Sequence, residues 1–310
     1  IINELNYTTK LKAIKNEVEI ANIYKSQIRD GVAMVRFMKW LKENVGKVKI
    51  TEISVSDMLR SFRAEGENYK GDSFGTIAGY KDHAAMMHYS ATKESEYELK
   101  KEGMLLIDSG AQYLDGTTDI TRTFILGPIT EEEKRDYTLV LKGHIALASA
   151  KFLKGTTGMN LDILARRPLW DYGMDYKCGT GHGVGFFLNV HEGPHGLRQS
   201  GNTTVFEKGM IVTNEPGVYK AGKYGIRTEN TLLVVQDMKD EANGEFYSFK
   251  TVSYCPIDLE GIDIELLNRD EVNWLNNYHK EVYKKLLPYL SKEEKSFLKE
   301  ETREITWRKL

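Results

Sequence analysis

The sequence contains little cysteine, no long apolar run and no excess of charge of one sign. Cys178 and Cys255 are its two cysteines among 310 residues, too few for a disulfide framework, which favours a reducing compartment, and we expect the cytoplasm. No run approaches the roughly 18 apolar residues that span a bilayer, and the first residues lack a signal-peptide pattern, so no membrane partner is expected. The 43 basic and 45 acidic residues give a formal net charge of −2, which argues against a nucleic-acid partner.

The composition is that of a globular protein. Hydrophobic residues make up 41% of the chain and charged residues 28%, a balance that provides a sizeable core and excludes disorder as the dominant state. The length is compatible with two domains or one large one. Because the sequence begins with Ile1 and not with methionine, we expect it to be a piece of a longer protein or a processed form.

Apolar spacing and capping residues predict helices in several parts of the chain. Residues 16–44 carry apolar side chains at three- and four-residue steps, which is typical of a long amphipathic helix. Residues 160–172 also form a predicted helix, which Pro168 must kink or start. The predicted caps of the other helices are Thr51 or Ser54, Thr130 with Glu133, Asn268, and Ser291 with Glu294.

Strand-like runs at 104–107, 120–126, 210–213 and 231–235 contain an internal repeat. In each half, a Gly-Met turn leads into a strand that ends at an acidic residue, and a second acidic residue accompanies the next strand. The acidic residues are Asp108 and Asp119 in the first half, and Glu215 and Glu229 in the second. The repeat predicts two related α+β halves packed face to face, with the four carboxylates meeting between them.

Taken singly, these four residues could be ordinary turn or surface acids. Asp108 follows an apolar strand, however, where a carboxylate is costly unless it is paired or binds a metal. Asp119 alternates with Thr121 and Thr123, which predicts one shared strand face, and Arg227 shares a side with Glu229 in the same way. Four acids at matched positions are hard to explain as solvated charge.

Two of the seven histidines lie in the glycine-rich run of residues 179–194. His182 stands between glycines, which allow the backbone to approach a ligand closely. His191 follows in the same run, and His88, in a Met-Met-His-Tyr-Ser sequence, is a weaker candidate when taken alone. We assign the other four to structure or surface: His83, His144, His195 and His279.

Four carboxylates and one imidazole make an oxygen-rich ligand set for two divalent ions. Hard ligands of this kind favour Mn²⁺, Mg²⁺ or Fe²⁺ over the zinc that thiolates select. Two such ions polarise a water molecule near neutral pH and stabilise a tetrahedral oxyanion. The reaction class that follows is hydrolysis of an amide or an ester.

In these motifs the sequence resembles the pita-bread metallopeptidases (peptidase M24), the family of methionine aminopeptidase, prolidase and Xaa-Pro aminopeptidase. The resemblance rests on five runs in order: Ile107 to Gly110, Thr118 to Thr123, Gly181 to Gly183, Asn214 to Gly217, and Arg227 to Asn230. Carried over by position, the family's metal ligands fall on Asp108, Asp119, His182, Glu215 and Glu229, and its substrate-handling histidines on His88 and His191. Residues 73–79, 182–194 and 270–279 are most similar to the long, multi-domain cytosolic Xaa-Pro aminopeptidases.

The resemblance implies an α+β fold with two pseudo-symmetric halves, a curved and mostly antiparallel sheet, and a helical C-terminal extension. Residues 1–250 would form the catalytic domain, and residues 251–310 the extension, through which relatives form a homodimer. The N-terminal creatinase-like domains of the long enzymes are absent from this sequence. Cys178 departs from relatives that have a histidine four residues before the metal histidine, and we interpret it as a buried, inert cysteine.

The implied substrates are peptides with proline in second position, and the implied cofactor is a pair of divalent ions, for which we expect Mn²⁺. Asp119 and Glu229 would bridge the ions, with Asp108 on one and His182 with Glu215 on the other. Glu215 would also pass a proton to the departing proline nitrogen. His88 and His191 would hydrogen-bond the substrate, and Arg227 would orient Asp119 or Glu229.

Two alternatives remain open. Prolidase, which cleaves free Xaa-Pro dipeptides, shares all five ligands, although residues 182–194 and the tail favour the aminopeptidase. Non-catalytic pita-bread proteins bind histones or nucleic acid, but they typically lose metal ligands that this sequence retains.

Overall fold

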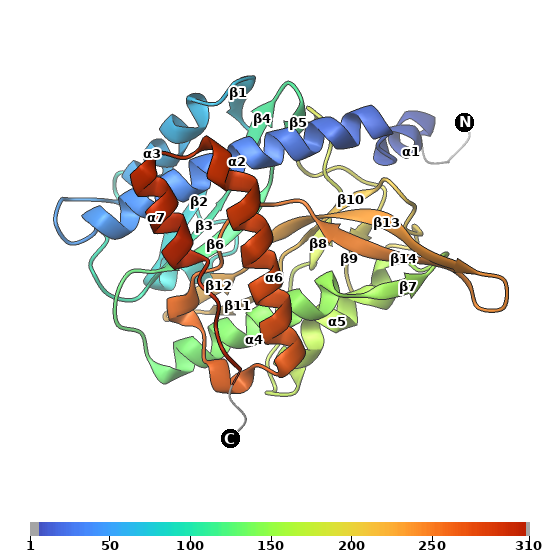
Figure 1. Ribbon diagram of the computed structural model, residues 1–310. Helices are drawn as coiled ribbons and strands as arrows, with labels where there is room; N and C mark the ends of the chain where they lie inside the picture. Colours follow the sequence, from blue (N-terminus) through green and yellow to red (C-terminus); the bar gives the residue numbers. More distant parts are fainter. Residues whose placement is uncertain (1–5, 308–310) are drawn as a thin grey trace.

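The computed structural model describes residues 6–307 and shows an α+β protein in which every pairing between its strands is antiparallel. Two main sheets lie at its centre, and helices pack against them (Figure 1). None of the helices in this part of the chain is long and apolar enough to cross a bilayer. The predicted α+β class with mostly antiparallel strands agrees with this arrangement.

The first half contains the sheet β2-β3-β6, formed by β2 (Ile77–Tyr80), β3 (Met104–Ser109) and β6 (Ile120–Ile125). Helices α2 (Glu17–Asn44) and α3 (Glu52–Ala64) accompany it, and they begin after the caps Asn16 and Thr51. Their apolar faces bury Phe37 and Leu59 in one core with Leu105 and Phe124. The predicted helix over 16–44 is confirmed to within one residue.

The second half contains the sheet β10-β13-β14-β7, formed by β10 (Ile211–Asn214), β13 (Asn230–Asp240), β14 (Gly244–Thr251) and β7 (Lys151–Leu153). Helices α4 (Glu131–Ala148) and α5 (Gly158–Trp170) belong to this half. They approach closely at Gly143, where an added Cβ would lie 2.2 Å from the carbonyl oxygen of Ala165. The predicted capping box of Thr130 and Glu133 is present at the start of α4.

The structure excludes one of the two roles predicted for Pro168. It lies inside the last turn of α5, so it does not start the helix, which begins at Gly158. The missing N–H of Pro168 removes one intrahelical hydrogen bond, and the helix stops two residues later at Trp170.

The two halves meet along the strands that the sequence repeat identifies. β3 pairs with β6, and β10 pairs with β13 in the same antiparallel manner. The Glu229 N–H donates to the Thr121 carbonyl oxygen at 3.1 Å, and the Thr231 hydroxyl donates to the Asp119 carbonyl oxygen at 3.1 Å. These bonds cross between the halves and bring the two acidic strand ends together.

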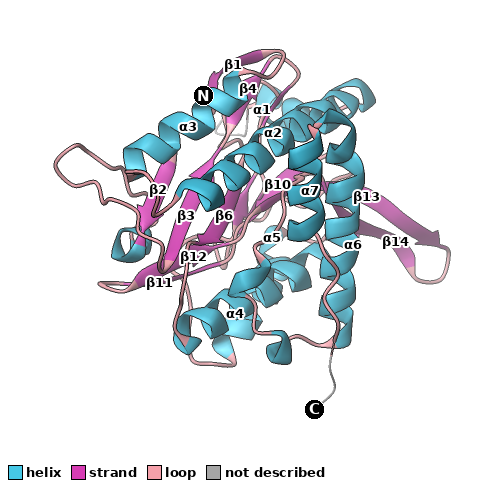
Figure 2. Ribbon diagram, turned by 60° about the vertical axis from the view of Figure 1, so that its left-hand side comes forward, coloured by secondary structure: helices cyan, strands magenta, loops and turns pink. Residues whose placement is uncertain are grey.

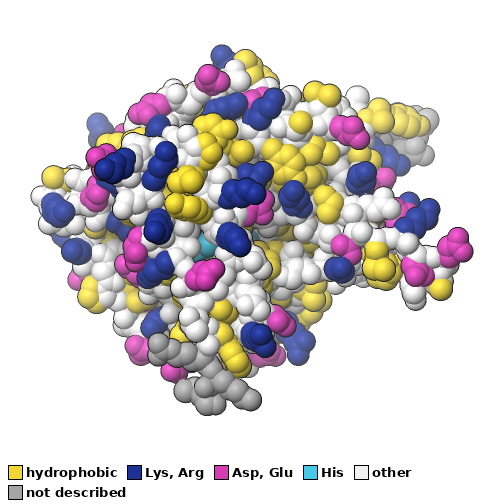
Figure 3. Space-filling model, in the orientation of Figure 1, with side chains coloured by type: hydrophobic (Ala, Val, Ile, Leu, Met, Phe, Trp, Pro, Cys, Tyr) yellow, Lys and Arg dark blue, Asp and Glu magenta, His cyan; other side chains and the backbone are white. Residues whose placement is uncertain are grey.

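The C-terminal part consists of η2 (Leu259–Gly261), η3 (Ile264–Leu266), α6 (Arg269–Leu286), η4 (Leu287–Tyr289) and α7 (Lys292–Glu301). Helices α6 and α7 pack against α2, and α6 also lies against α4 (Figure 2). The predicted cap Asn268 and the predicted capping box of Ser291 and Glu294 are present, and Asn268 forms a capping box as well. On the face that includes these helices, basic and acidic side chains are intermixed, and neither sign covers a continuous area (Figure 3).

β2, β7 and β14 were not predicted from the sequence, and neither were several further short elements, which offer too few residues to show a periodic pattern. The helical ones are α1 (Tyr7–Ala13), the 3₁₀ turn η1 (Lys81–Ala85) and the 3₁₀ turns η2, η3 and η4. The remaining strands are β1 (Tyr69–Asp72), β4 (Ala111–Tyr113), β5 (Gly116–Thr117), β8 (Gly181–His182), β9 (Gly196–Leu197), β11 (Gly217–Lys220) and β12 (Tyr224–Arg227). They form small two- and three-stranded sheets, and β8, β11 and β12 carry residues of the site described next.

Candidate metal centre

The four predicted carboxylates occupy matched positions in the two strand pairs. Asp108 lies near the end of β3 and Glu215 directly after β10, while Asp119 directly precedes β6 and Glu229 directly precedes β13. Asp108, Asp119 and Glu229 are buried and Glu215 is partly buried. The topology therefore brings together the acids that the repeat places in separate thirds of the sequence.

His182 approaches these carboxylates from β8. Its backbone N–H donates to the Thr213 hydroxyl at 3.0 Å, and its Nδ1 lies 2.9 Å from the Gly183 carbonyl oxygen. Because a carbonyl oxygen only accepts, Nδ1 carries the proton, and Nε2 is directed at the acids. Nε2 lies 3.3 Å from Asp119 Oδ2 and 3.5 Å from Glu215 Oε1.

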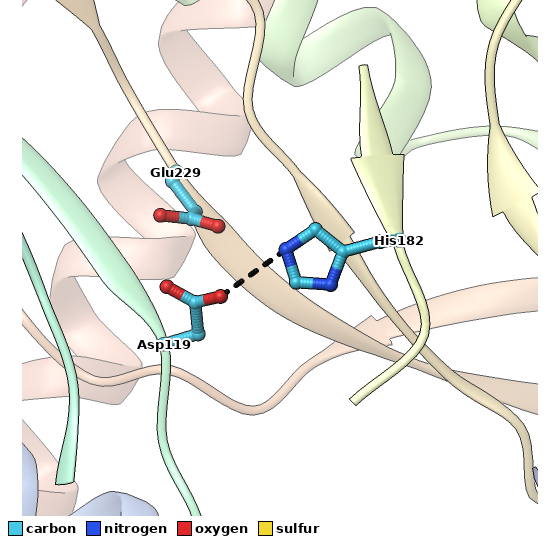
Figure 4. A group of neighbouring side chains, drawn as sticks. All are labelled: Asp119, His182 and Glu229. Carbon is cyan, nitrogen blue, oxygen red and sulfur yellow. Dashed lines mark ion pairs between the residues drawn. The ribbon is translucent and has the colours of Figure 1, made fainter. Parts of the chain in front are cut away.

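Ligand atoms of Asp119, His182 and Glu229 all lie within 4.8 Å of one another. Figure 4 shows the three side chains pointing toward one another from separate segments of the chain. A carboxylate–imidazole group of this size matches the spacing of donors around a single metal ion, and Asp108 and Glu215 extend it.

Burial makes the ionised carboxylates expensive here. Loss of hydration raises the pKa of Asp119 to about 7, and it raises the pKa values of Glu215 and Glu229, with further increases from the neighbouring carboxylates. Burial opposes a charge on His182, but its contacts with Asp119 and Glu215 raise its pKa to about 9. Additional positive charge would therefore stabilise the ionised form of these carboxylates, and divalent cations supply such charge.

Arg227 contacts a different acid from those predicted. Its Nη2 donates to Asp108 Oδ2 at 2.5 Å, and its Nε lies 3.2 Å from the Thr121 hydroxyl oxygen. It reaches Glu229 only through Thr121, whose hydroxyl donates to Glu229 Oε2 at 2.7 Å. Among the described residues Arg227 has no hydrogen bond to Asp119 or Glu229, the acids that we expected it to orient, because the end of β12 places the guanidinium beside β3.

The residues present fit a pair of metal ions. Asp108 Oδ1 is buried and accepts no hydrogen bond within the described residues, although Oδ2 is paired with Arg227. A buried carboxylate oxygen without a partner is costly, and a cation would satisfy it. Four carboxylates and one imidazole are the hard donor set that Mn²⁺ and Mg²⁺ accept.

The site opens into a cavity of about 90 Å³. His88 and His191 lie on its wall and are exposed, and the His191 ring meets the His182 ring edge to face with centroids 4.2 Å apart. The lining residues are Phe74, Ile77, Met87, His88, Asp108, Asp119, Cys178, His182, His191, Glu215, Tyr219 and Arg227. All the predicted site residues except the deeper Glu229 therefore line one cavity.

Sequence reasoning missed Tyr219 as a site residue. Its hydroxyl accepts from Arg227 Nη1 at 2.7 Å, and the side chain lines the cavity. The sequence could have identified Tyr219. It lies four residues after Glu215, and in an extended segment alternate residues share one face, so both side chains point to the same side.

Cys178 lies in the cavity wall and is partly buried. Burial raises the pKa of its thiol to about 11, so the side chain is a neutral thiol at physiological pH. The thiol form agrees with an inert cysteine, but the side chain is only partly buried, whereas we expected it to be buried.

The four histidines assigned to structure or surface are buried and lie outside the cavity. His83 Nδ1 lies 3.0 Å from both oxygens of Glu52, and His144 Nδ1 lies 3.1 Å from the Asn214 carbonyl oxygen. His195 Nε2 contacts the Ile211 carbonyl oxygen, and His279 Nε2 accepts from the Ile257 N–H. Their contacts are those of structural residues.

Comparison with known proteins identifies relatives of the whole chain. The model of metallopeptidase family M24 matches residues 21–236, and the model of the C-terminal region of peptidase M24 matches residues 245–305. A "Probable Xaa-Pro aminopeptidase P" of Laccaria bicolor is 45% identical over 99% of this chain and 48% of its own length. "Aminopeptidase P1" of Arabidopsis thaliana is 43% identical over 95% of this chain and 50% of its own length.

Solved structures give the same picture. The X-prolyl aminopeptidase of Caenorhabditis elegans, described as a cytosolic enzyme with a di-nuclear active site, matches 97% of this chain and 50% of its own, at 38% identity and a TM-score of 0.93. A prolidase from Pyrococcus furiosus matches 79% of this chain and 66% of its own, at 28% identity and a TM-score of 0.65. These matches confirm the predicted pita-bread fold, and this chain spans about half the length of its aminopeptidase relatives.

Proposed function

The chain belongs to metallopeptidase family M24, and on this premise we propose that it hydrolyses the bond between an N-terminal residue and a following proline. One observation carries the proposal. Five ligand-type side chains from two strand pairs and β8 converge beside a cavity that two further histidines line. The specificity for proline is supported by the name of the Laccaria bicolor relative, a probable Xaa-Pro aminopeptidase P that is 45% identical over 99% of this chain.

The proposed ligands of the two divalent cations are those of the sequence prediction. Asp119 and Glu229 would be shared between the cations, Asp108 would bind one, and His182 with Glu215 would bind the other. When bound, the pair would activate a water molecule and stabilise the oxyanion that forms from the substrate carbonyl. We propose Mn²⁺ as the ion, because the donor set is hard and contains no thiolate.

The chain's own residues would position the substrate and move its protons. His88 and His191 are exposed at the cavity and would donate hydrogen bonds to the substrate carbonyl or backbone. Glu215 would carry a proton to the departing proline nitrogen. Arg227 fixes Asp108 through one oxygen, which determines where the other points.

Cleavage of Xaa-Pro dipeptides is a second candidate function. The likeness to a Pyrococcus furiosus prolidase favours it, since that structure shares the fold of most of this chain. The extent of the aminopeptidase matches, which include the C-terminal part, favours the first candidate.

Residues 1–250 and 251–310 would act as the catalytic domain and as the extension through which two copies associate. The separate family match to residues 245–305 supports this division. We propose that the protein acts in the cytoplasm, as the Caenorhabditis elegans relative is described to do. Sedimentation of the chain tests the association, because a homodimer would have twice the 35.4 kDa mass of one chain.

The decisive experiment offers the Mn²⁺-loaded chain an Xaa-Pro-Yaa tripeptide and an Xaa-Pro dipeptide in parallel, with products identified by mass. Release of free Xaa from the tripeptide is the expected result. Cleavage of the dipeptide alone would favour prolidase activity. Cleavage of neither peptide would contradict the proposed activity for this chain.

A further inference from the structure

Lys15 is a buried lysine in the short segment between α1 and α2. Its side chain is 1% exposed, and its Nζ donates to the Val184 carbonyl oxygen at 2.6 Å. Its backbone N–H donates to the Gly209 carbonyl oxygen at 3.0 Å, which fixes the segment against the second half of the molecule. A buried ammonium group is costly, so the contacts that retain it here require an explanation.

The acid opposite Lys15 is Glu192, the residue that follows His191. Lys15 Nζ lies 3.6 Å from Glu192 Oε1, and Lys12 Nζ lies 3.0 Å from Glu192 Oε2. The Glu192 side chain is 3% exposed, and within residues 6–307 neither oxygen accepts a hydrogen bond of good geometry. The two ammonium groups therefore compensate the buried carboxylate, and the Lys15 group is the one shielded from water.

These contacts join both ends of the loop between His182 and Glu192. The Glu192 N–H donates to the Gly183 carbonyl oxygen at 2.8 Å, so the two ends of the loop lie side by side. They are packed so closely that a Cβ on Gly183 would lie 2.0 Å from the Glu192 carbonyl oxygen. Lys15 contacts one end at Val184 and the other at Glu192, and so fixes their separation.

His191 belongs to the end that Glu192 anchors. Its ring packs edge to face on His182, which itself lies 3.3 Å from Asp119. The His191 side chain is exposed and lies at the wall of the cavity. Because few neighbours surround it, the direction of the imidazole ring depends on the backbone of residue 191.

We propose that Lys15 and Glu192 are positioning residues that fix His191 against His182 at the cavity. Lys15 acts from outside the cavity, through Glu192 and the Val184 carbonyl. The part of the proposal that concerns turnover rests on the proposed function, whereas the part that concerns the position of His191 does not.

The first test needs no metal and no substrate. Imidazole ¹H–¹⁵N correlation spectra of the metal-free, ¹⁵N-labelled chain would be compared for wild type, Lys15→Met and Lys12→Met, with the His191 peaks assigned by their loss in His191→Ala. We expect Lys15→Met to displace the His191 peaks. Lys12→Met is the matched control, because Lys12 pairs with the same carboxylate from a partly exposed position and lacks the hydrogen bond that Lys15 donates to the Val184 carbonyl oxygen. We expect it to displace the His191 peaks less than Lys15→Met does.

Coincident His191 peaks in Lys15→Met and wild type would overturn the proposal. If Lys15→Met does not fold, Glu192→Gln is the replacement, since it retains the size of the side chain and removes its charge. The same displacement is expected, and its absence counts equally against the proposal.

The second test separates positioning from general stability by a kinetic cycle in the Mn²⁺-loaded chain. We expect Lys15→Met to lower kcat by at least about tenfold in the wild-type background, and by less than about twofold when His191 is already alanine. Equal losses in both backgrounds would show that Lys15 does not act through His191. If neither the wild type nor any variant hydrolyses peptide, the proposed function is wrong. The imidazole spectra would then still decide the role of Lys15.

Discussion

Arg227 binds one carboxylate oxygen of Asp108 and leaves the other without a hydrogen bond. Nη2 of the buried arginine lies 2.5 Å from Asp108 Oδ2, and Oδ1 has no hydrogen-bond partner among the described residues. The arginine thus fixes the orientation of Asp108 but leaves Oδ1 without a hydrogen bond, and a cation can bind that oxygen. The contact crosses from β12 in the second half to β3 in the first.

Replacement of Arg227 by methionine should destabilise the metal-free chain. It leaves Asp108 as a buried acid without its counter-ion, which typically costs about 3–5 kcal/mol. Urea unfolding followed by circular dichroism measures the loss. Tyr219→Phe is the matched control, because it removes the hydroxyl that accepts from Nη1 and retains the ion pair with Asp108. Equal stabilities of Arg227→Met and Tyr219→Phe would contradict the importance of the pair.

Replacement of Glu229 by alanine should abolish peptide hydrolysis and lower the bound metal from two ions to one, because this acid is a proposed shared ligand. Elemental analysis of the loaded, desalted chain gives the metal content. Thr121→Val is the control, since it removes the hydrogen bond to Glu229 Oε2 and retains the carboxylate, so two ions should remain. Retained turnover, or two ions in Glu229→Ala, would refute the ligand assignment.

The repeated Gly-Met turns and acidic strand ends were sufficient to predict which carboxylates meet. The position of an acid on its own strand follows from the residues around it in the sequence. Each half has the same kind of strand pair, so each half carries its two acids at matching positions. The partner of Arg227 could not be predicted in this way. A long side chain at the end of a strand can reach several acids, and only the packing of β12 beside β3 selects Asp108.

The burial of Lys15 could not be predicted from the sequence either. Nothing local distinguishes it from Lys10 or Lys12, because its burial depends on Val184 and Glu192, about 170 residues away. The caps of α3, α4, α6 and α7 were predictable because each involves residues three apart in the chain.

His279 should contribute to the loss of stability in acid. Burial lowers its pKa from 6.5 to about 3, and its Nε2 accepts a hydrogen bond from the Ile257 N–H at 3.0 Å. Below pH 6.5 the His279 imidazole therefore binds a proton in the unfolded chain but not in the folded chain. The free energy of unfolding consequently decreases as the pH falls below 6.5. The expected loss from this residue between pH 8 and pH 5 is about 2 kcal/mol.

His279→Gln tests this, because glutamine can provide an acceptor and does not titrate. Unfolding free energies of wild type and variant would be measured at pH 8 and at pH 5. The difference at pH 8 gives the structural cost of the substitution, and the change in that difference gives the ionisation effect. His144 and His195 retain their own acid sensitivity in both proteins, so they cancel. A difference that does not change with pH would contradict the prediction.

Arg122 should be one of the most important polar residues for stability. It is 1% exposed, and its guanidinium donates to the carbonyl oxygens of Thr121, Glu229, Cys255 and Pro256. It thereby connects β6, the approach to β13 and the start of the C-terminal part. Arg122→Met would leave several buried carbonyl groups unsatisfied, at about 1–3 kcal/mol each, so we expect a loss of at least about 3 kcal/mol.

Arg60→Met is the comparison that separates the burial of Arg122 from the chemistry of arginine. Arg60 also forms ion pairs, with Asp57 and Asp72, but its side chain is 48% exposed. Exposed pairs contribute about 0–1 kcal/mol, because water screens them and the side chains lose conformational freedom. Urea unfolding of both variants should therefore give losses that differ by at least about 2 kcal/mol. Similar losses would mean that the carbonyl groups around Arg122 find water or other donors when the guanidinium is removed, and the two halves and the C-terminal part would then be held together by apolar packing.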